Sequence, residues 1–395
     1  MKKEIVIFTP GGFFGGSEKT LYNFLKTTTI NKERILVVLP LKIDNGLCDK
    51  IRRLGVGTFV VGIDKDKTFS NILIKNICFL IMYFIRRIIY FMKVIYILIK
   101  VNPKVVYLNN IYCDVEAIAS FILNKKIIWH IKGTGMSNRF IERIRYLLIL
   151  KLSSKVIALT NSDKNKILKY CKIKYSNKIE IIPEGIDAQI KASLEKDKEN
   201  FLREILGTKN VSNKIIVGMV SNLIYLKGID LFADIAKSIV RKNKDVIFVH
   251  IGGKGVDQSN YYFRRVINIS KEILNKNLFF LGFKDDILEH MNLFDIFFFP
   301  TRAEGQPLVV MEAMLLGKAV LTSAVDGNLE LIKDTISGML FQKGNIEEMK
   351  NKLNKLILDN KLRKFLGDNA KKKIIKEFRL ENSTRKLERV IMKSI

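Results

Sequence analysis

The stretch that decides the fold runs from Phe297 to Met314 and reads FFFPTRAEGQPLVVMEAM. Its aromatic start has the length and composition of a β-strand. Pro307 suits the first turn of a helix and Gly317 suits the position after its end, so we expect a helix over residues 307–316. A strand, a polar loop and a helix in this order form the unit from which doubly wound α/β sheets are built.

Similar units repeat on both sides of this stretch. Apolar runs of strand length alternate with helix-length segments, which favours parallel sheets covered on both faces. The expected strands are 5–9, 35–39, 58–61, 105–108, 127–130 and 156–160 in the first half and 215–220, 246–251, 279–281, 296–300 and 319–322 in the second.

The pattern stops near residue 185, and a charged stretch follows at 191–198. The sequence therefore predicts an α/β protein of two Rossmann-like, doubly wound domains that face each other across a cleft. We expect an N-terminal, acceptor-side domain over 1–190 and a C-terminal, donor-binding domain over 191–370. The remaining helical segment, 371–395, is expected to pack back on the N-terminal domain.

Composition narrows the class of protein. The chain has 395 residues, of which 48% are hydrophobic and 27% charged, and this excludes a disordered or low-complexity protein. The formal net charge of +29 points to partners that carry phosphate, although Lys is used so freely that part of the excess is ordinary surface charge. The four cysteines show neither metal nor redox spacing, and the first apolar run is too short for an export signal, so we expect a cytoplasmic protein.

Two carboxylates in the opening stretch can carry chemistry. Glu304 is expected in the loop at the end of a strand, where it can accept hydrogen bonds from sugar hydroxyls. Glu312 is expected inside the helix, where it can hold a ribose diol. Between them, the helix N-terminus near Gln306 and Pro307 offers backbone N–H groups to a diphosphate. Either glutamate alone could be an ordinary surface acid, but the Gly-Gln-Pro turn between them favours a site.

The stretch from Pro300 to Gly338 resembles the donor-binding core of retaining family 4 glycosyltransferases of the GT-B fold, the type found in bacterial surface-polysaccharide synthesis. The resemblance includes the pair of glutamates with seven residues between them. Outside this stretch, Gly15-Gly16 resembles the family's N-terminal glycine turn and Lys227-Gly228 its phosphate-binding lysine. Residues 182–187 resemble the interdomain turn.

The resemblance implies a retaining transferase that moves a sugar from a nucleotide-diphosphate sugar to a glycan or lipid-linked acceptor. It implies catalytic roles for Lys227, Glu304 and His130. His130 is expected at the end of a strand, in contact with the donor sugar. Without the resemblance, a single His at the end of a strand is more often structural. The implied donor-binding residues are Gly15, Gly16, Asn222, Lys227, Gly305, Gln306, Pro307, Leu308 and Glu312.

Two positions depart from the family's pattern. Asn222 stands where an Arg is usual, which removes one positive charge from the diphosphate site. Glu184 stands where Asn is usual, and its role is open. The family resembled works without a metal ion, so we expect no cofactor. Asp64 and Asp66 have the spacing of a metal-binding acid pair, but we interpret them as a surface turn.

A basic, apolar stretch lies in the N-terminal half. No Asp or Glu occurs between Lys67 and Cys113, and the residues from 72 to 99 are mostly apolar but interrupted by Arg86, Arg87 and Lys93. This favours a buried or interfacial helix over a membrane-spanning one. We expect these three cations to dock on an anionic lipid surface at the inner face of the membrane and to admit the acceptor; a core helix with a basic edge is the alternative.

Two other functions remain open. A sugar-nucleotide epimerase uses a similar two-domain arrangement, and the net charge would permit a nucleic-acid-binding protein. The sequence holds no recognition-helix or aromatic RNA-binding signature, so we expect no nucleic acid partner.

Overall fold

The computed structural model describes residues 3–10, 15–41, 46–63, 77–132, 139–171, 173–189, 196–208, 211–253 and 261–395. The chain divides into unit 1, Met1–Gly185 with Leu380–Ile395, and unit 2, Ile186–Arg379. The sequence predicts boundaries between its segments at 190/191 and 370/371. In the structure, the boundaries between the two units lie at 185/186 and 379/380.

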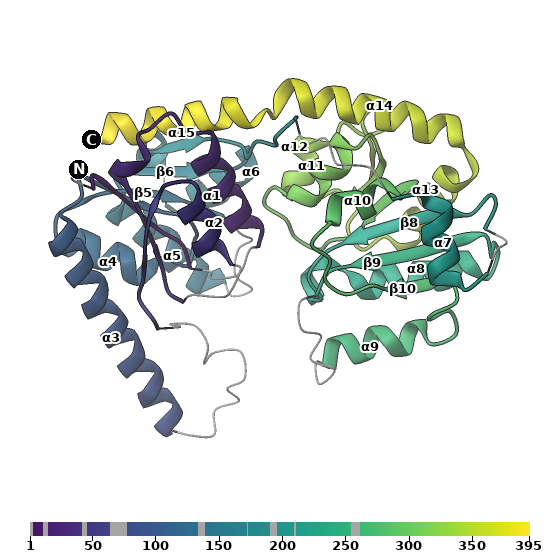
Figure 1. Cartoon of the computed structure of the whole chain (residues 1–395), viewed down its shortest axis with the longest axis horizontal. Coiled ribbons are helices and arrows are strands. Elements are labelled where there is room, and N and C mark those ends of the chain that lie inside the picture. Colours follow the sequence, from purple (N-terminus) through teal and green to yellow (C-terminus); the bar gives the residue numbers. More distant parts are fainter. Residues whose placement is uncertain are drawn as a thin grey trace. The chain divides into compact units, whose positions relative to one another are not determined.

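Unit 1 is a seven-stranded parallel sheet in the order β3-β2-β1-β4-β5-β6-β7, with helices on both faces (Figure 1). Apolar side chains of α1, α2 and α15 pack on one face, and those of α3 to α6 pack on the other. Its elements are β1 (Ile5–Phe8), α1 (Gly16–Thr27), η1 (Lys32–Arg34), β2 (Ile35–Leu39), α2 (Leu47–Arg53), β3 (Gly57–Val60), α3 (Ile77–Val101), β4 (Val105–Leu108), α4 (Asp114–Ile122), β5 (Lys126–His130), α5 (Arg139–Leu152), β6 (Lys155–Ala158), α6 (Asn161–Cys171), η2 (Ile173–Lys178), β7 (Ile179–Ile181) and α15 (Leu380–Ser394).

Unit 2 is a six-stranded parallel sheet in the order β10-β9-β8-β11-β12-β13, built around one apolar core. Its elements are α7 (Lys198–Leu206), β8 (Ile215–Val220), η3 (Tyr225–Lys227), α8 (Ile229–Val240), β9 (Val246–Ile251), α9 (Tyr261–Ser270), β10 (Leu278–Phe280), α10 (Ile287–Asn292), β11 (Ile296–Phe299), α11 (Leu308–Leu315), β12 (Ala319–Ser323), α12 (Asp326–Leu331), β13 (Met339–Phe341), α13 (Ile346–Leu358) and α14 (Asn360–Glu377).

Both sheets have the same topology. In each unit the chain starts at an inner strand and adds strands outward to one edge of the sheet. It then returns and adds the remaining strands on the other side of the first strand. This switch lies between β1 and β4 in unit 1 and between β8 and β11 in unit 2. In doubly wound sheets, ligands bind outside the carboxyl ends of the strands at this switch point. The fold class predicted from the sequence, two Rossmann-like α/β units, is confirmed.

Some elements differ from the prediction. The helix expected over 307–316 is α11, which begins one residue later because Pro307 is extended and occupies the N-cap. The helical segment expected over 371–395 contains the last turns of α14, which begins at Asn360, and the whole of α15, which follows after Phe378 and Arg379. The edge strands β7 and β13, of three residues each, were not predicted.

Candidate functional site

The two loops at the switch point of unit 2 bring Lys227 and Glu304 together. Lys227 ends the short helix η3 that follows β8, and Glu304 lies in the loop after β11. Nζ of Lys227 is 2.5 Å from Oε1 of Glu304, and the two side chains are 24% and 8% exposed. Oγ1 of Thr301 lies 3.2 Å from the same carboxylate oxygen. A lysine and an acid that the sequence assigned to phosphate and sugar thus form one largely buried ion pair.

The backbone explains why these loops stay together. Gly228 has φ +74°, and a Cβ at this position would lie 1.9 Å from the carbonyl oxygen of Pro300. Only glycine allows this conformation at this close approach. The carbonyl oxygen of Leu226 then accepts hydrogen bonds from the Arg302 N–H at 2.7 Å and from Oγ1 of Thr301 at 3.0 Å. The close packing of the two loops therefore requires glycine at position 228, and the neighbouring Lys227 adds the ion pair with Glu304.

The start of α11 is equally constrained. A Cβ on Gly327, in α12, would lie 1.5 Å from the carbonyl oxygen of Gly305, so α12 supports the turn of Gly305 and Gln306 directly. Pro307 caps the helix, Leu308 begins it, and no acidic residue lies in its first turn. The N–H groups of this turn and the positive end of the helix dipole suit an anion.

Glu312 and Asn222 occupy different surroundings. Glu312 lies within α11 and is 5% exposed. Asn222 lies two residues after β8 with an exposed side chain, and its carbonyl oxygen accepts a hydrogen bond from the Ile224 N–H at 2.9 Å. The Asn222 side chain therefore stands next to the Lys-Gly loop, at the carboxyl end of the sheet.

Sequence reasoning missed the role of Arg302. Its guanidinium makes two parallel hydrogen bonds to Asp230, at 2.8 and 2.7 Å, and lies 3.9 Å from the ring centroid of Tyr225. Burial favours a higher pKa for Asp230, but hydrogen bonds from Arg302 and Tyr262 outweigh it and lower the pKa. This ion pair joins the β11 loop to the first turn of α8. The only sign of this pair in the sequence is that Arg302 lies within the stretch 297–314, and the sequence alone does not show which acid it contacts.

In unit 1, Gly15 and Gly16 begin α1, just beyond the carboxyl end of β1. Gly15 is the N-cap with extended backbone angles. The first turn also contains Glu18, which is 7% exposed and accepts a hydrogen bond from Oγ1 of Thr9 at 3.4 Å. A carboxylate therefore already lies close to the glycine turn that the sequence assigned to phosphate.

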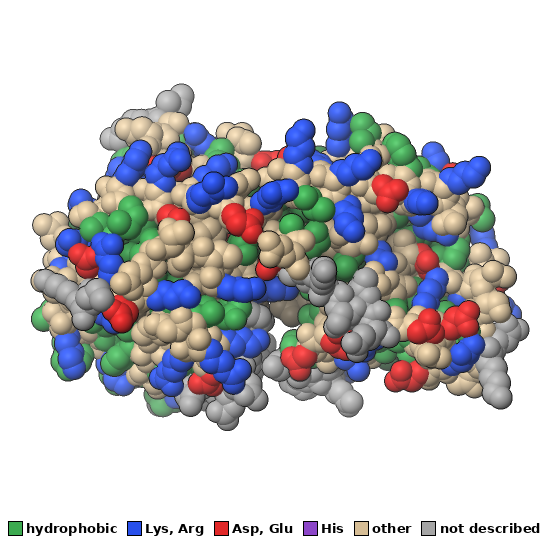
Figure 2. All heavy atoms as spheres, turned by 45° about the horizontal axis from the view of Figure 1, so that its top comes forward, with side chains coloured by type: hydrophobic (Ala, Val, Ile, Leu, Met, Phe, Trp, Pro, Cys, Tyr) green, Lys and Arg blue, Asp and Glu red, His purple; other side chains and the backbone are tan. Residues whose placement is uncertain are grey.

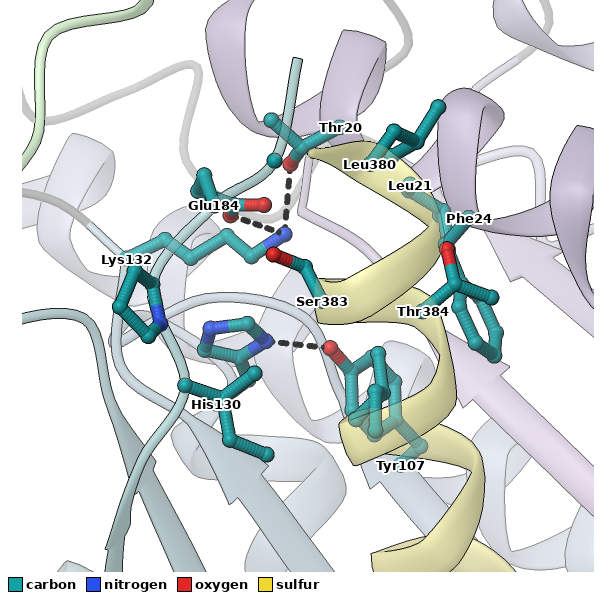
Figure 3. A pocket seen from close by; sticks show the side chains of 14 residues that line it. Thr20, Leu21, Phe24, Tyr107, His130, Lys132, Glu184, Leu380, Ser383 and Thr384 are labelled. Atoms are coloured by element: carbon teal, nitrogen blue, oxygen red, sulfur yellow. Dashed lines mark hydrogen bonds and ion pairs between the residues drawn. The ribbon is translucent and has the colours of Figure 1, made fainter. Parts of the chain in front are cut away.

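His130 lies at the carboxyl end of β5 and lines a pocket with side chains of α1, α15 and the segment 182–185 (Figure 3). The histidine is 2% exposed. Its Nδ1 is 2.5 Å from the hydroxyl of Tyr107 in β4, and its Nε2 has no hydrogen-bond partner among the described residues. Burial, followed by the charge of Lys132, holds the pKa of His130 well below its usual range.

The same pocket contains a buried ion pair. Nζ of Lys132 is 2.8 Å from Oε1 of Glu184 and donates to Oγ1 of Thr20 at 2.6 Å. The two charged side chains are 7% and 12% exposed. Glu184, whose role the sequence left open, thus neutralises a lysine two residues beyond His130 (Figure 3).

Arg86, Arg87 and Lys93 lie on α3, and the structure gives them different partners. Arg87 is held by Asp114 at 2.8 Å and by the hydroxyl of Tyr83 at 2.7 Å. Lys93 donates to the carbonyl oxygen of Val61 at 3.0 Å. Arg86 is exposed, and no hydrogen bond or ion pair of its side chain is seen in the described part of the chain.

Asp64 and Asp66 lie outside the described residues. Within the described ranges, no group of three or more His, Cys, Asp or Glu side chains is arranged to hold a metal ion. The helices in those ranges include none with the length and apolar character needed to cross a membrane.

Two doubly wound units, with an ion-paired lysine and glutamate at the switch point of the second, define the class of protein. The chain has the GT-B fold. It is similar over 99% of its length to the crystal structure of Anabaena HepE in complex with UDP and glucose, with a TM-score of 0.78, 21% identity and 99% of that chain covered. This likeness shows the fold.

Residues 203–373 match the family described as Glycosyl transferases group 1. The matched segment lies within unit 2 and spans less than half of the chain. It is 29% identical over 241 residues to the Escherichia coli UDP-Gal:alpha-D-GlcNAc-diphosphoundecaprenol alpha-1,3-galactosyltransferase, and the alignment covers 60% of each chain. It is 26% identical over 365 residues to the Campylobacter jejuni N,N'-diacetylbacillosaminyl-diphospho-undecaprenol alpha-1,3-N-acetylgalactosaminyltransferase, which covers 88% of this chain and 89% of the relative.

Proposed function

We propose that this protein is a retaining glycosyltransferase that moves a sugar from a nucleotide-diphosphate sugar to a glycan or lipid-linked acceptor in cell-surface polysaccharide synthesis. The observation that carries the proposal is the Lys227–Glu304 pair at the switch point of unit 2, inside the segment that matches the family. The names of the relatives support it, because both act on sugars linked to a polyprenyl diphosphate.

The chemistry follows from where charge develops. Cleavage of the bond between the sugar and the diphosphate leaves negative charge on the leaving phosphate, and preorganised cations and N–H groups stabilise such charge strongly. In this proposal Lys227 and the first turn of α11 bind the diphosphate without a metal ion. Glu304 accepts hydrogen bonds from the sugar, and Glu312 holds the ribose. The inferred front-face attack, assisted by the leaving phosphate, would retain the anomeric configuration.

A transfer assay tests this function. The purified chain is screened against UDP- and GDP-sugars by thermal shift, and the stabilising donors are then incubated with a polyprenyl-diphosphate sugar acceptor. We expect a product heavier by one sugar, with the donor's anomeric configuration and with unchanged yield in EDTA. Lys227→Met should abolish transfer, whereas Lys214→Met should not, because Lys214 pairs with Asp245 at the opposite end of β8. A changed sugar nucleotide without any acceptor product would show an epimerase instead.

The exposed face of α3 supports a peripheral place at an anionic membrane. Several of its large apolar side chains are 45% to 62% exposed, and α4 and α5 add further exposed apolar side chains. They are Ile81, Met82, Phe84, Ile85, Ile88, Ile89, Met92, Tyr96 and Ile99 in α3, Ile118, Phe121 and Ile122 in α4, and Phe140, Ile141, Ile144 and Leu148 in α5. An apolar face of this extent, with basic residues and no acid on α3, suits a lipid surface.

Charge alone does not locate this surface. Lys and Arg side chains are spread over the whole of the face drawn in Figure 2. The apolar side chains are therefore the better target for a test by flotation on vesicles of phosphatidylglycerol or of phosphatidylcholine. We expect binding to the anionic vesicles, lost in Phe84→Ser/Ile88→Ser and kept in Phe365→Ser, a change at a similarly exposed apolar residue of unit 2. Equal binding to both vesicles, or to neither, would contradict the proposal.

A further inference from the structure

The pocket around His130 raises the question of which ring nitrogen carries the proton. The hydroxyl of Tyr107 lies 2.5 Å from Nδ1, and Tyr107 is 1% exposed. In the described part of the chain, this histidine is the only hydrogen-bond partner of that hydroxyl. In Figure 3, Tyr107 stands on one side of the imidazole ring, and the second nitrogen is turned away from it.

Two arrangements are compatible with the short contact. If Nδ1 carries the proton, it donates to the phenol oxygen, and both the phenol O–H and the Nε2 lone pair stay without a partner. If the phenol donates to Nδ1, only the Nε2–H stays unmatched. A buried polar group without a partner costs about 1–3 kcal/mol, so the second arrangement is favoured. Burial, which lowers the pKa of His130, disfavours a third arrangement, in which the ring is charged.

We propose that Tyr107 is a positioning residue, whose hydroxyl fixes His130 in the tautomer with the proton on Nε2, so that the histidine acts as a neutral hydrogen-bond donor to a hydroxyl oxygen of the substrate. This inference rests on the proposed function. In this tautomer the lone pair of Nδ1 is already engaged by Tyr107, and Nε2 has none. His130 therefore does not serve as a general base.

The setting of the pocket agrees with a hydroxyl ligand. The lining includes Ser383 of α15 and the paired charges of Lys132 and Glu184, so its formal charges cancel. The pocket adjoins the carboxyl ends of β4 and β5, the edge of a doubly wound sheet where ligands bind. A buried N–H at such an edge, with no protein acceptor described, is a donor that a bound hydroxyl or water can satisfy.

Nitrogen-15 NMR of the histidine side chains tests the inference, because the chain contains only three histidines and the tautomers have distinct nitrogen shifts. At neutral pH we expect His130 to show one neutral form, protonated on Nε2. Tyr107→Phe should give a mixture of both tautomers. It should also lower kcat about tenfold, the loss of about one net hydrogen bond, with the KM for the donor changed less than twofold.

Tyr90→Phe is the matched control. Tyr90 is also buried in unit 1 and donates to Glu116 at 2.6 Å, but it belongs to the core on the other face of the sheet. The control should lose a similar amount of stability and keep both the His130 signature and the parent kcat. A charged or Nδ1-protonated His130, or Tyr107→Phe with the parent's tautomer and kcat, would overturn the inference. If the protein transfers no sugar but its His130 is neutral and protonated on Nε2, the proposed function is refuted and the tautomer assignment stands.

Discussion

Glu304→Gln should increase the affinity for a nucleoside diphosphate while it reduces sugar transfer. In the structure, the Lys227 ammonium is engaged by Oε1 of Glu304 at 2.5 Å. A diphosphate that binds Lys227 competes with this carboxylate for the ammonium. The substitution removes the competing charge and keeps the size of the side chain, so the lysine is available to the phosphate without an exchange of partners.

The magnitude follows from the exposure of the pair. Exposed ion pairs contribute about 0.2–1 kcal/mol, and breaking a fully buried one costs about 3–5 kcal/mol. With side chains 24% and 8% exposed, this pair lies between these limits, and we estimate about 1–2 kcal/mol. This energy corresponds to binding tighter by about 5- to 30-fold.

Isothermal titration calorimetry with UDP and GDP measures the effect on parent and variant at one ionic strength. The gain should appear for the nucleoside diphosphate that the parent prefers, and kcat for sugar transfer should fall by about 100-fold, as when a transition-state contact is lost. Unchanged or weaker binding of that nucleotide, in a variant with the parent's circular dichroism and melting temperature, would refute the reasoning.

Three further outcomes follow from other contacts. Glu312→Ala should weaken nucleotide binding about tenfold, since hydrogen bonds to charged groups contribute about 1.5–3 kcal/mol; equal affinity in calorimetry would contradict its assignment to the ribose. Gly327→Ala should destabilise unit 2 by about 1–3 kcal/mol in urea unfolding, because the new Cβ meets the Gly305 carbonyl at 1.5 Å. Burial lowers the pKa of His250 to about 3 from about 6.5 when unfolded, so stability is full above pH 6.5 and falls below it as the unfolded chain takes up the proton. Between pH 7.5 and 5.5 the loss from His250 should be about 1.4 kcal/mol, and His250→Gln should remove it.

Most of the fold could be predicted from sequence, because apolar runs and loop signals are local. The strands 35–39, 105–108, 215–220 and 246–251 match the structure residue for residue. The strands β7 and β13 were missed, since three residues at the edge of a sheet carry little periodic signal. The stretch 72–99 was expected as a buried or interfacial helix, and α3 has exposed apolar side chains along one face, which periodicity alone does not reveal.

The residues of the candidate site could be predicted from the sequence, but most of their ion-pair partners could not. The meeting of Lys227 and Glu304 follows from topology, because the loops after β8 and β11 flank one switch point. The pairs Arg302–Asp230 and Lys132–Glu184 join residues 72 and 52 positions apart, and no spacing rule connects them. Their detection required the packing of the loops in three dimensions.

The Lys227–Glu304 pair bears on how the proposed donor is recognised. Because Lys227 already has a carboxylate partner in the structure, a diphosphate that engages this lysine competes with Glu304 and does not simply add a charge. When a phosphate takes Lys227, the Glu304 carboxylate, 8% exposed, loses its counter-charge and requires new donors. Sugar hydroxyls can supply them, but a nucleoside diphosphate without a sugar lacks them. The parent should therefore prefer the sugar nucleotide over the bare diphosphate, and Glu304→Gln should reduce that preference, because its neutral amide needs no replacement charge.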